Sequence, residues 1–224
     1  MKLPSFLESK PCAICGSGEY RVKYSWPKKF YNREKYETCS WDGRQDIPLQ
    51  IVSCTSCGFI YTNPSFKEKN LELIYPGDII DKTLSPENLF NPKNKKFNSI
   101  LKIAKQYKKS GVLMDIGTRF GALPKIATDR YGYQGYGIEY NPASVEYGKK
   151  YFSNIYEGTI TTLLGLTKKL KRPEIIVMDD VLEHLVYPNR DFDIIQTIQT
   201  KGDIIIMRQM DYNSLGRKLF GKSW

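Results

Sequence analysis

Residues 112–121 read VLMDIGTRFG, an apolar stretch that contains one acid and runs into a turn with two glycines. The apolar stretch predicts a buried strand, and the turn after such a strand is a common place for a ligand. A turn that holds a dinucleotide would show the pattern G-x-G-x-x-G, because the pyrophosphate needs backbone N–H groups at close range. Here only Gly117 and Gly121 are present, with Arg119 between them. The glycines alone therefore do not name the ligand.

The chain around this stretch alternates between short apolar runs and helix-length segments. A first helix is predicted where apolar side chains recur with helical spacing from Phe97 to Tyr107, and Gly111 follows as a stop signal. Strands are predicted at 112–116, 136–138, 174–178 and 203–207, with a short one at 154–158. Helices are predicted between them at 121–131, 142–152, 159–170 and 189–199. This alternation predicts an α/β fold, a Rossmann-like parallel sheet with helices on both faces and ligands at the carboxyl ends of the strands.

Length and charge set the broad class of the protein. The 224 residues allow one full domain and a small module, and the net charge is +10 with a pI near 9.2. Such charge can indicate an anionic partner, but the lysine clusters at 93–96, 105–109 and 168–172 lie on or beside predicted amphipathic helices. Solvated helix faces explain them better. No stretch suits a membrane span or a secretory signal, so we expect a cytoplasmic protein without a membrane partner.

The cysteines form two C-x-x-C pairs, Cys12 with Cys15 and Cys54 with Cys57, and glycine follows the second cysteine of each pair. A disulfide framework is unexpected in the cytosol. Four thiolates suit a closed tetrahedral zinc site with no open position for chemistry, so we expect structural zinc. The alternatives are four unrelated buried thiols or a redox pair. We assign no role to Cys39.

Two acids follow predicted strands. Asp115 lies two residues before Gly117, where a pyrophosphate site would avoid negative charge, and Glu139 ends the second strand, where an acid can bind ribose hydroxyls. A carboxylate at Asp115 suits a positively charged ligand without phosphate, and S-adenosylmethionine fits this description. Nicotinamide enzymes also have an acid at the position of Glu139. Asp115 is therefore the residue that distinguishes a protein that binds S-adenosylmethionine from a nicotinamide enzyme. The alternative is that Asp115 caps a helix and Glu139 is a surface acid.

The motifs in their order resemble a known family. The segments VLMDIGTRFGALPKIA, GYGIEYNPASVEYGKKY and EIIVMDDVLEHLVYP are similar to those of class I S-adenosylmethionine-dependent methyltransferases. The front end, with CAICGSG and IVSCTSCGFIYTNP, resembles the zinc-binding domain of a subgroup that includes sugar C-methyltransferases. The end, DYNSLGRKLFGKSW, resembles the segment after the fifth strand in the same subgroup.

The resemblance implies a role for individual residues around the cofactor. Glu139 would hold the ribose, Tyr140 would pack near the adenine and Asp179 would face the cofactor. The loop on the methionine side would consist of Asp115, Gly117, Thr118 and Gly121. Arg119 stands where many methyltransferases have glycine, and we expect binding to survive this departure.

Methyl transfer needs an aligned nucleophile and is helped by a base that removes its proton. His184 is the single histidine of the chain and follows the fourth predicted strand, so it is the candidate base, with Glu183 orienting it or binding substrate. The alternative for His184 is a ring that bonds the helix start or lies in the core.

These patterns predict a zinc-binding module at 1–65, a connecting arm at 66–93 and a methyltransferase domain at 94–224. The expected acceptor is a small molecule, with a nucleotide-linked sugar as the candidate. The rivals are an RNA methyltransferase, suggested by the basic charge, and a cofactor-binding or assembly module without turnover. The last predicted strand is an apolar edge after which the family usually adds two strands, so we expect a truncated chain and self-association through that edge.

Overall fold

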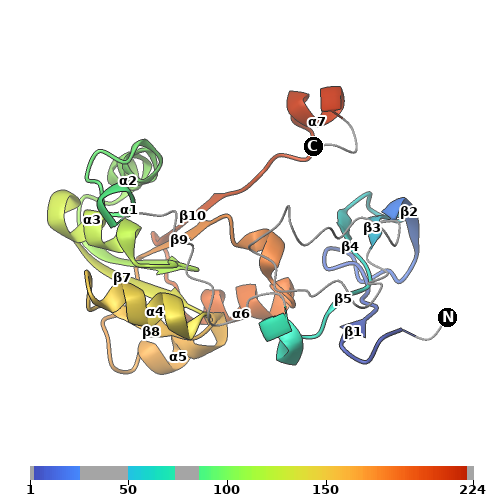
Figure 1. Cartoon of the computed structure of the whole chain (residues 1–224), viewed down its shortest axis with the longest axis horizontal. Coiled ribbons are helices and arrows are strands. Elements are labelled where there is room, and N and C mark those ends of the chain that lie inside the picture. The colour runs from blue at the N-terminus through green and yellow to red at the C-terminus, as the bar shows by residue number, and fades with distance from the viewer. Residues whose placement is uncertain (1–2, 26–49, 74–85, 221–224) are drawn as a thin grey trace. The chain divides into compact units, whose positions relative to one another are not determined.

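The computed structural model describes residues 3–25, 50–73 and 86–220, and its elements are labelled in Figure 1. The chain divides into two compact units. Unit 1 comprises Met1–Asp81 together with Val186–Arg190, and unit 2 comprises Lys82–Leu185 and Asp191–Trp224. The expected domain boundaries at 65 and 93 stay predictions, and residues 74–85 of the expected arm lie outside the described residues. No helix among the described residues is long and apolar enough to cross a membrane.

Unit 2 is built on one parallel sheet, which confirms the predicted fold class. Its five strands lie in the order β10-β9-β6-β7-β8, and every neighbouring pair is parallel. The strands are β6 (Gly111–Ile116), β7 (Tyr133–Glu139), β8 (Ile155–Glu157), β9 (Ile175–Asp179) and β10 (Ile204–Arg208). Because β6 pairs with β7 on one side and β9 on the other, the chain changes direction across the sheet there. This is the Rossmann-like arrangement, with its switch point at β6.

Helices cover both faces of this sheet (Figure 1). The helical elements from Pro86 onward are α1 (Pro86–Leu89), α2 (Lys95–Tyr107), α3 (Ala122–Tyr131), α4 (Pro142–Lys149), α5 (Leu163–Leu166), α6 (Pro188–Ile198), α7 (Leu215–Phe220) and the 3-10 turns η3 (Ile160–Thr162) and η4 (Leu182–His184), of which α2 and α3 pack on one face of the sheet and η3, α5 and α6 on the other. Asn94 and Asn141 cap α2 and α4 by accepting hydrogen bonds from the third residue beyond them.

The strand alternation divides the core in two. Leu113, Ile175 and Val177 face α2 and α3, whereas Met114, Ile176 and Met178 face η3, α5 and α6. The alternate side chains of a strand point to opposite faces, so apolar runs without polar interruptions give a sheet that is buried on both sides.

The predicted helix at 159–170 is wrong in length, because the structure has only η3 and α5 there. The Thr159 hydroxyl accepts from the Thr161 N–H, and the Thr162 hydroxyl donates to the Thr159 carbonyl. Such bonds compete with the helix ladder, and Gly165 lowers helix propensity further.

Unit 1 consists of small antiparallel sheets. Strands β2 (Tyr20–Ser25), β3 (Gln50–Cys54) and β4 (Ile60–Thr62) form one, and β1 (Leu7–Glu8) pairs with β5 (Ser65–Phe66), after which the 3-10 segment η2 (Glu68–Leu73) follows. The fully buried Asn63 accepts hydrogen bonds from the Lys10 N–H and the Ser9 hydroxyl, so it ties the start of the chain to the β4–β5 turn. Cys39 lies outside the described residues.

Candidate functional site

The loop between β6 and α3 folds against the end of β7. The N–H groups of Gly117 and Thr118 both donate to the Ile138 carbonyl, at 2.8 and 3.0 Å. Gly117 and Gly121 have left-handed φ values of 69° and 78°, and a Cβ at Gly117 would lie 2.7 Å from Val181 Cγ2. Arg119 also has positive φ, 56°, and so it keeps the backbone conformation that glycine prefers.

Asp115 is a buried acid at the centre of this edge. Its side chain comes from β6, whose neighbours at that level are Gly137 and Val177. Burial raises the pKa of Asp115 to about 7, and the charges of Asp179 and Glu139 add to the rise, whereas Thr118 and Lys96 oppose it. The Thr118 hydroxyl is buried and has no hydrogen bond of good geometry among the described residues. The site therefore concentrates carboxyl groups where a cation would be favoured.

Glu139 joins the two loops that follow β6 and β7. One carboxylate oxygen accepts from the Arg119 N–H at 2.8 Å, and the other accepts from the Asn141 N–H at 2.9 Å. Burial raises the pKa of Glu139, and these backbone N–H groups oppose the rise. Each carboxylate oxygen has a second lone pair, so the side chain can still accept bonds from a ligand.

Asp179 ends β9 and is paired with two cations. Lys96 Nζ of α2 lies 2.7 Å from one Asp179 oxygen and 3.3 Å from Asp180, and Arg208 at the end of β10 contacts both acids. Asp180 has a positive φ of 57°. Lys96 lies on the solvated face predicted for the first lysine cluster, and its side chain is 42% exposed while it pairs with both acids. Arg208 was not among the predicted site residues. The feature of the sequence that could have indicated it is its position at the carboxyl end of a strand, and in the sheet register it lies opposite Asp179.

The predicted catalytic residues follow the same edge. Glu183 and His184 lie in η4, shortly after β9 ends at Asp179, and both side chains are exposed. The His184 N–H donates to the Val181 carbonyl, which closes the 3-10 turn. Tyr140 directly follows Glu139 and is partly buried. The roles assigned to these three side chains stay predictions.

The two C-x-x-C segments of unit 1 have the same backbone. Gly16 donates to the Cys12 carbonyl and Cys12 to the Ser17 carbonyl; likewise Gly58 donates to Cys54 and Cys54 to Phe59. Both glycines have left-handed φ, 74° at Gly16 and 78° at Gly58. A glycine after each pair was therefore an informative signal, because these turns need positive φ.

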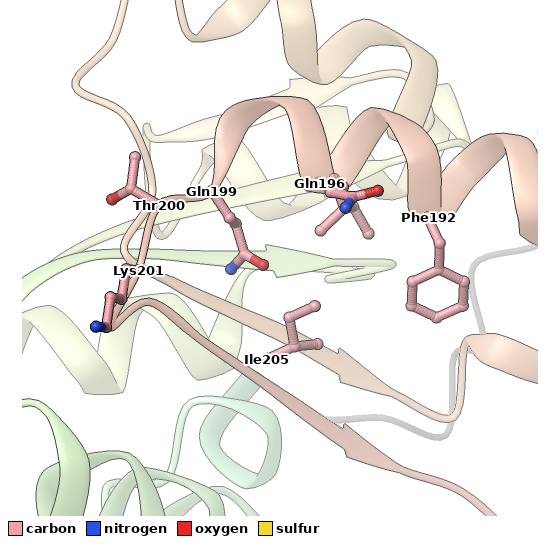
Figure 2. A pocket seen from close by; sticks show the side chains of 7 residues that line it. Phe192, Gln196, Gln199, Thr200, Lys201 and Ile205 are labelled. Carbon is pink, nitrogen blue, oxygen red and sulfur yellow. The ribbon is translucent and has the colours of Figure 1, made fainter.

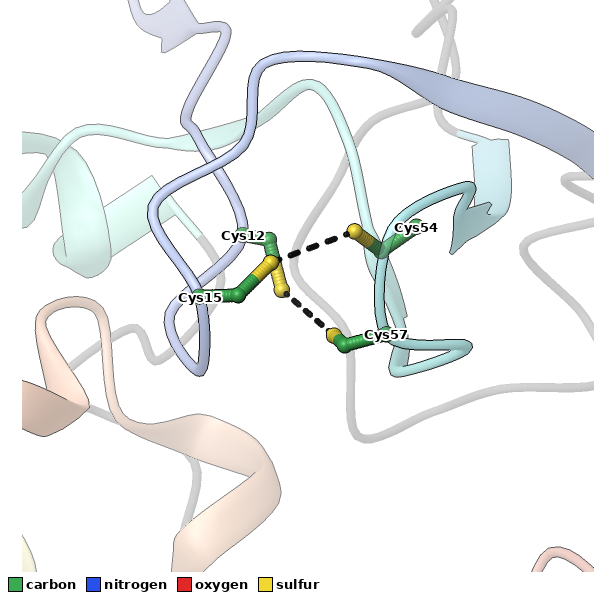
Figure 3. A group of neighbouring side chains, drawn as sticks. All are labelled: Cys12, Cys15, Cys54 and Cys57. Carbon is green, nitrogen blue, oxygen red and sulfur yellow. Dashed lines mark hydrogen bonds between the residues drawn. The ribbon is translucent and has the colours of Figure 1, made fainter.

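The four sulfurs point toward one another from the two turns (Figure 3). The Cys12–Cys57 and Cys15–Cys54 distances are each 3.5 Å, and all four sulfurs lie within 4.8 Å of one another. A tetrahedral zinc with bonds of about 2.3 Å needs sulfurs about 3.8 Å apart, so the donor set fits. The backbone N–H groups of Cys57 and Ser56 lower the pKa of Cys54 to about 6, whereas burial and the neighbouring thiols raise the pKa of Cys57 to about 12 against the bond from the Phe59 N–H. A thiolate is the form that binds metal.

A groove between α6 and β10 was not predicted from the sequence. It has a volume of about 380 Å³, and Figure 2 shows the helix side chains on one side and Ile205 of β10 on the other. Its lining comprises Phe192, Ile195, Gln196, Gln199, Thr200, Lys201 and Ile205. Asp115, Glu139 and Asp179 are not among the residues that line this groove. Since β10 is the last strand in the sheet order, the groove lies along one edge of the sheet. Self-association through this edge stays a prediction.

No protein-family model matches this sequence, and a search of curated proteins gave no match. Solved structures to which this chain is similar include precorrin-6y C5,15-methyltransferase from Geobacter metallireducens, 14% identical, with a TM-score of 0.42 over 64% of this chain and 73% of that one. An S-adenosylmethionine-dependent methyltransferase from Clostridium acetobutylicum is 11% identical, with a TM-score of 0.41 over 68% and 58%.

Human N-acetylserotonin methyltransferase, solved in complex with S-adenosylmethionine, is 18% identical, with a TM-score of 0.40 over 60% of this chain and 42% of its own. The chain thus spans less than two thirds of the last two proteins. We draw no conclusion from likenesses at this level.

Proposed function

We propose that unit 2 binds S-adenosylmethionine and transfers its methyl group to a small molecule, with a nucleotide-linked sugar as the first candidate acceptor. We further propose that the four cysteines of unit 1 hold a structural zinc ion. The observation that carries the first proposal is the buried acid Asp115 near the carboxyl end of β6, with Glu139 at the end of the neighbouring strand β7.

The charge of this edge argues for a cationic ligand. A pyrophosphate would add negative charge beside the carboxyl groups of Asp115 and Glu139, whose burial leaves such repulsion poorly screened. A sulfonium or ammonium group would instead favour ionised Asp115 and offset the burial that raises its pKa. This supports S-adenosylmethionine over a dinucleotide.

The hydrogen-bonding groups also suit a nucleoside. Glu139 already holds the two loops together, and the remaining lone pairs of its carboxylate can accept the ribose hydroxyls. The buried Thr118 hydroxyl offers a polar group without a well-formed bond among the described residues. Gly117 has no side chain, so a ligand can approach the backbone of this loop closely.

The bound cofactor supplies a methyl group on a positively charged sulfur. The chain then has to orient the acceptor and take up its proton. We assign the proton to the His184 imidazole, which is exposed just beyond β9, and we assign Glu183 to orienting that ring or binding the acceptor. Four thiolates complete the coordination of zinc, so the metal has no open position for the reaction.

Calorimetry with S-adenosylhomocysteine tests the cofactor site. Asp115→Ala and Glu139→Ala should each abolish measurable binding. Asp129→Ala is the matched control, because Asp129 is an exposed acid of α3 that pairs with Lys125 one turn away. Normal binding by both site variants, or binding of NAD in place of S-adenosylhomocysteine, would overturn the assignment.

The acceptor class is tested with S-adenosylmethionine labelled in its methyl group. Label in nucleotide-linked sugars supports the proposal, label in RNA supports the first rival, and no label with normal cofactor binding supports the module without turnover. The structure weakens the argument for RNA from charge: Lys96 pairs with Asp179, Lys108 pairs with Glu174, and Lys105 lies over the Tyr133 ring. Net charge alone is therefore a poor guide to nucleic-acid binding here.

A further inference from the structure

Two cations of unit 2 converge on one carboxylate at the carboxyl edge of its sheet. Arg208, at the end of β10, donates from Nη2 to Oδ2 of Asp180, and Lys96 Nζ of α2 lies 3.3 Å from the same oxygen. Both cations also contact Asp179, whose side chain is 10% exposed. The side chains of Lys96, Arg208 and Asp180 are 42%, 45% and 40% exposed. A molecule in solution can therefore reach both cations and Asp180.

This cluster lies on the same face of the sheet as the buried acid of the proposed cofactor site. The core under α2 and α3 includes one side chain from each of β6, β9 and β10, namely Leu113, Val177 and Ile206. Two residues further along these strands stand Asp115, Asp179 and Arg208. Alternate residues of a strand point to the same face, so the three charged side chains share that face. The two cations thus stand beside the proposed cofactor site, on its β9–β10 side.

Stability does not account for this arrangement. Ion pairs between partly exposed side chains contribute little to folding. Lys96 stands in the first turn of α2, where the helix dipole disfavours a cation. Asp180 has a left-handed φ of 57°, which is a strained conformation for a residue other than glycine. Strain of this kind is typical of ligand sites, and here it places the Asp180 carboxylate between the two cations.

The donors of the cluster suit a phosphate. A guanidinium and an ammonium are the groups with which side chains bind phosphate oxygens. Arg208 uses Nε for Asp179 and Nη2 for Asp180, and a guanidinium has five N–H groups, so others can donate to a ligand. Asp179 holds both cations from the buried side. An anion from solvent can therefore replace Asp180 while Lys96 and Arg208 stay in place.

We propose that Lys96 and Arg208 bind a phosphate group of the acceptor, and that the Asp180 carboxylate fills this place in the unliganded chain. The proposal rests on the proposed function and narrows its acceptor to a molecule that carries phosphate, as a nucleotide-linked sugar does. The cation of the cofactor and the anion of the acceptor then have separate places at one edge of the sheet. The turn with His184 follows Asp180 closely in the chain, so the candidate base belongs to the acceptor side.

Calorimetry with inorganic pyrophosphate, on the full chain saturated with S-adenosylhomocysteine, tests this site. Pyrophosphate should bind, and Arg208→Gln should weaken its binding about tenfold or more, because a charge-assisted hydrogen bond is lost. Lys96→Gln should also weaken it and provides a second test if Arg208→Gln does not fold. Lys102→Gln is the matched control, because Lys102 is an exposed lysine of the same helix and its loss changes the net charge equally.

Asp180→Asn distinguishes a phosphate site from a cluster that only stabilises the fold. Asparagine tolerates left-handed φ and has the shape of aspartate, so the variant removes only the competing charge. Asp180→Asn should bind pyrophosphate about threefold or more tightly than the unaltered chain, whereas Arg208→Gln binds it more weakly. A purely structural cluster gives no such gain. Equal or weaker binding by Asp180→Asn, or equal binding by Arg208→Gln, would overturn the proposal.

The affinity for S-adenosylhomocysteine identifies the source of the anion, because the methionine end of the cofactor also carries a carboxylate. Arg208→Gln should leave this affinity unchanged. A tenfold loss would assign Arg208 to the cofactor carboxylate and would contradict binding of the acceptor. If S-adenosylhomocysteine does not bind the unaltered chain, the proposed function fails, while pyrophosphate titrations of the same variants without cofactor still decide whether Lys96 and Arg208 bind phosphate.

Discussion

Replacing Asp115 with asparagine should make the protein more stable, and by more at alkaline pH. The side chain is 4% exposed, and burial raises its pKa from 3.8 to about 7. Because the folded-state pKa is raised, the unfolded chain releases this proton first as the pH rises above 3.8. Stability then falls until the folded carboxyl also ionises near pH 7. Asparagine has the same shape and no charge to bury, so it removes this cost.

The size of the effect follows from the two pKa values. The cost of Asp115 is about 2 kcal/mol at about pH 5 and about 4 kcal/mol at about pH 8, at 1.36 kcal/mol for each pKa unit. The stability difference between Asp115→Asn and the unaltered chain should therefore grow by about 3 kcal/mol between these pH values. The same variant should lose affinity for S-adenosylmethionine, because the ligand's positive charge would no longer be neutralised by a carboxylate at this position.

Urea unfolding of both proteins at the two pH values measures the difference. Asp129→Asn is the control, because this exposed acid should give nearly the same stability difference at both pH values. If Asp115→Asn were destabilising at alkaline pH, or if its advantage did not grow with pH, burial of a charge at this edge would be the wrong explanation.

The other predictions concern the metal, the candidate base and the sheet edge. Elemental analysis of protein purified without chelator should find one zinc per chain, and Cys54→Ser should lose it; metal-free protein with an intact fold would contradict the zinc site. His184→Ala should slow methyl transfer about 10²-fold or more while cofactor affinity stays the same, and an unchanged rate would place the base elsewhere. Met207→Lys should lower any self-association seen by sedimentation velocity, because Met207 is 48% exposed on β10, and equal association by both proteins would exclude this edge.

The sheet could be predicted from the sequence because its strands are mainly apolar runs. Such runs are buried on both faces, and their spacing leaves room for the crossover helices. The segment at 159–170 misled because its apolar positions suit a helix, whereas its threonines bond to the local backbone instead. Periodicity records where apolar side chains lie and does not record this competition.

The cysteine site was predictable for a local reason, and the ion pairs were not. Two residues between the cysteines and a glycine after them define each turn within a few positions. The pairing of Lys96 with Asp179 and the hydrogen bond from Tyr187 to Glu8 join residues that are distant in the sequence. Nothing in the neighbourhood of either residue indicates such a partner, because the fold alone brings them together.

The most direct test of the account is a crystal structure of the chain soaked with S-adenosylmethionine. We expect the nucleoside at the carboxyl ends of β6 and β7, with its ribose hydroxyls on Glu139 and its charged methionine end beside Asp115. Density for a ligand elsewhere, or for a diphosphate lying across Gly117 and Gly121, would contradict it.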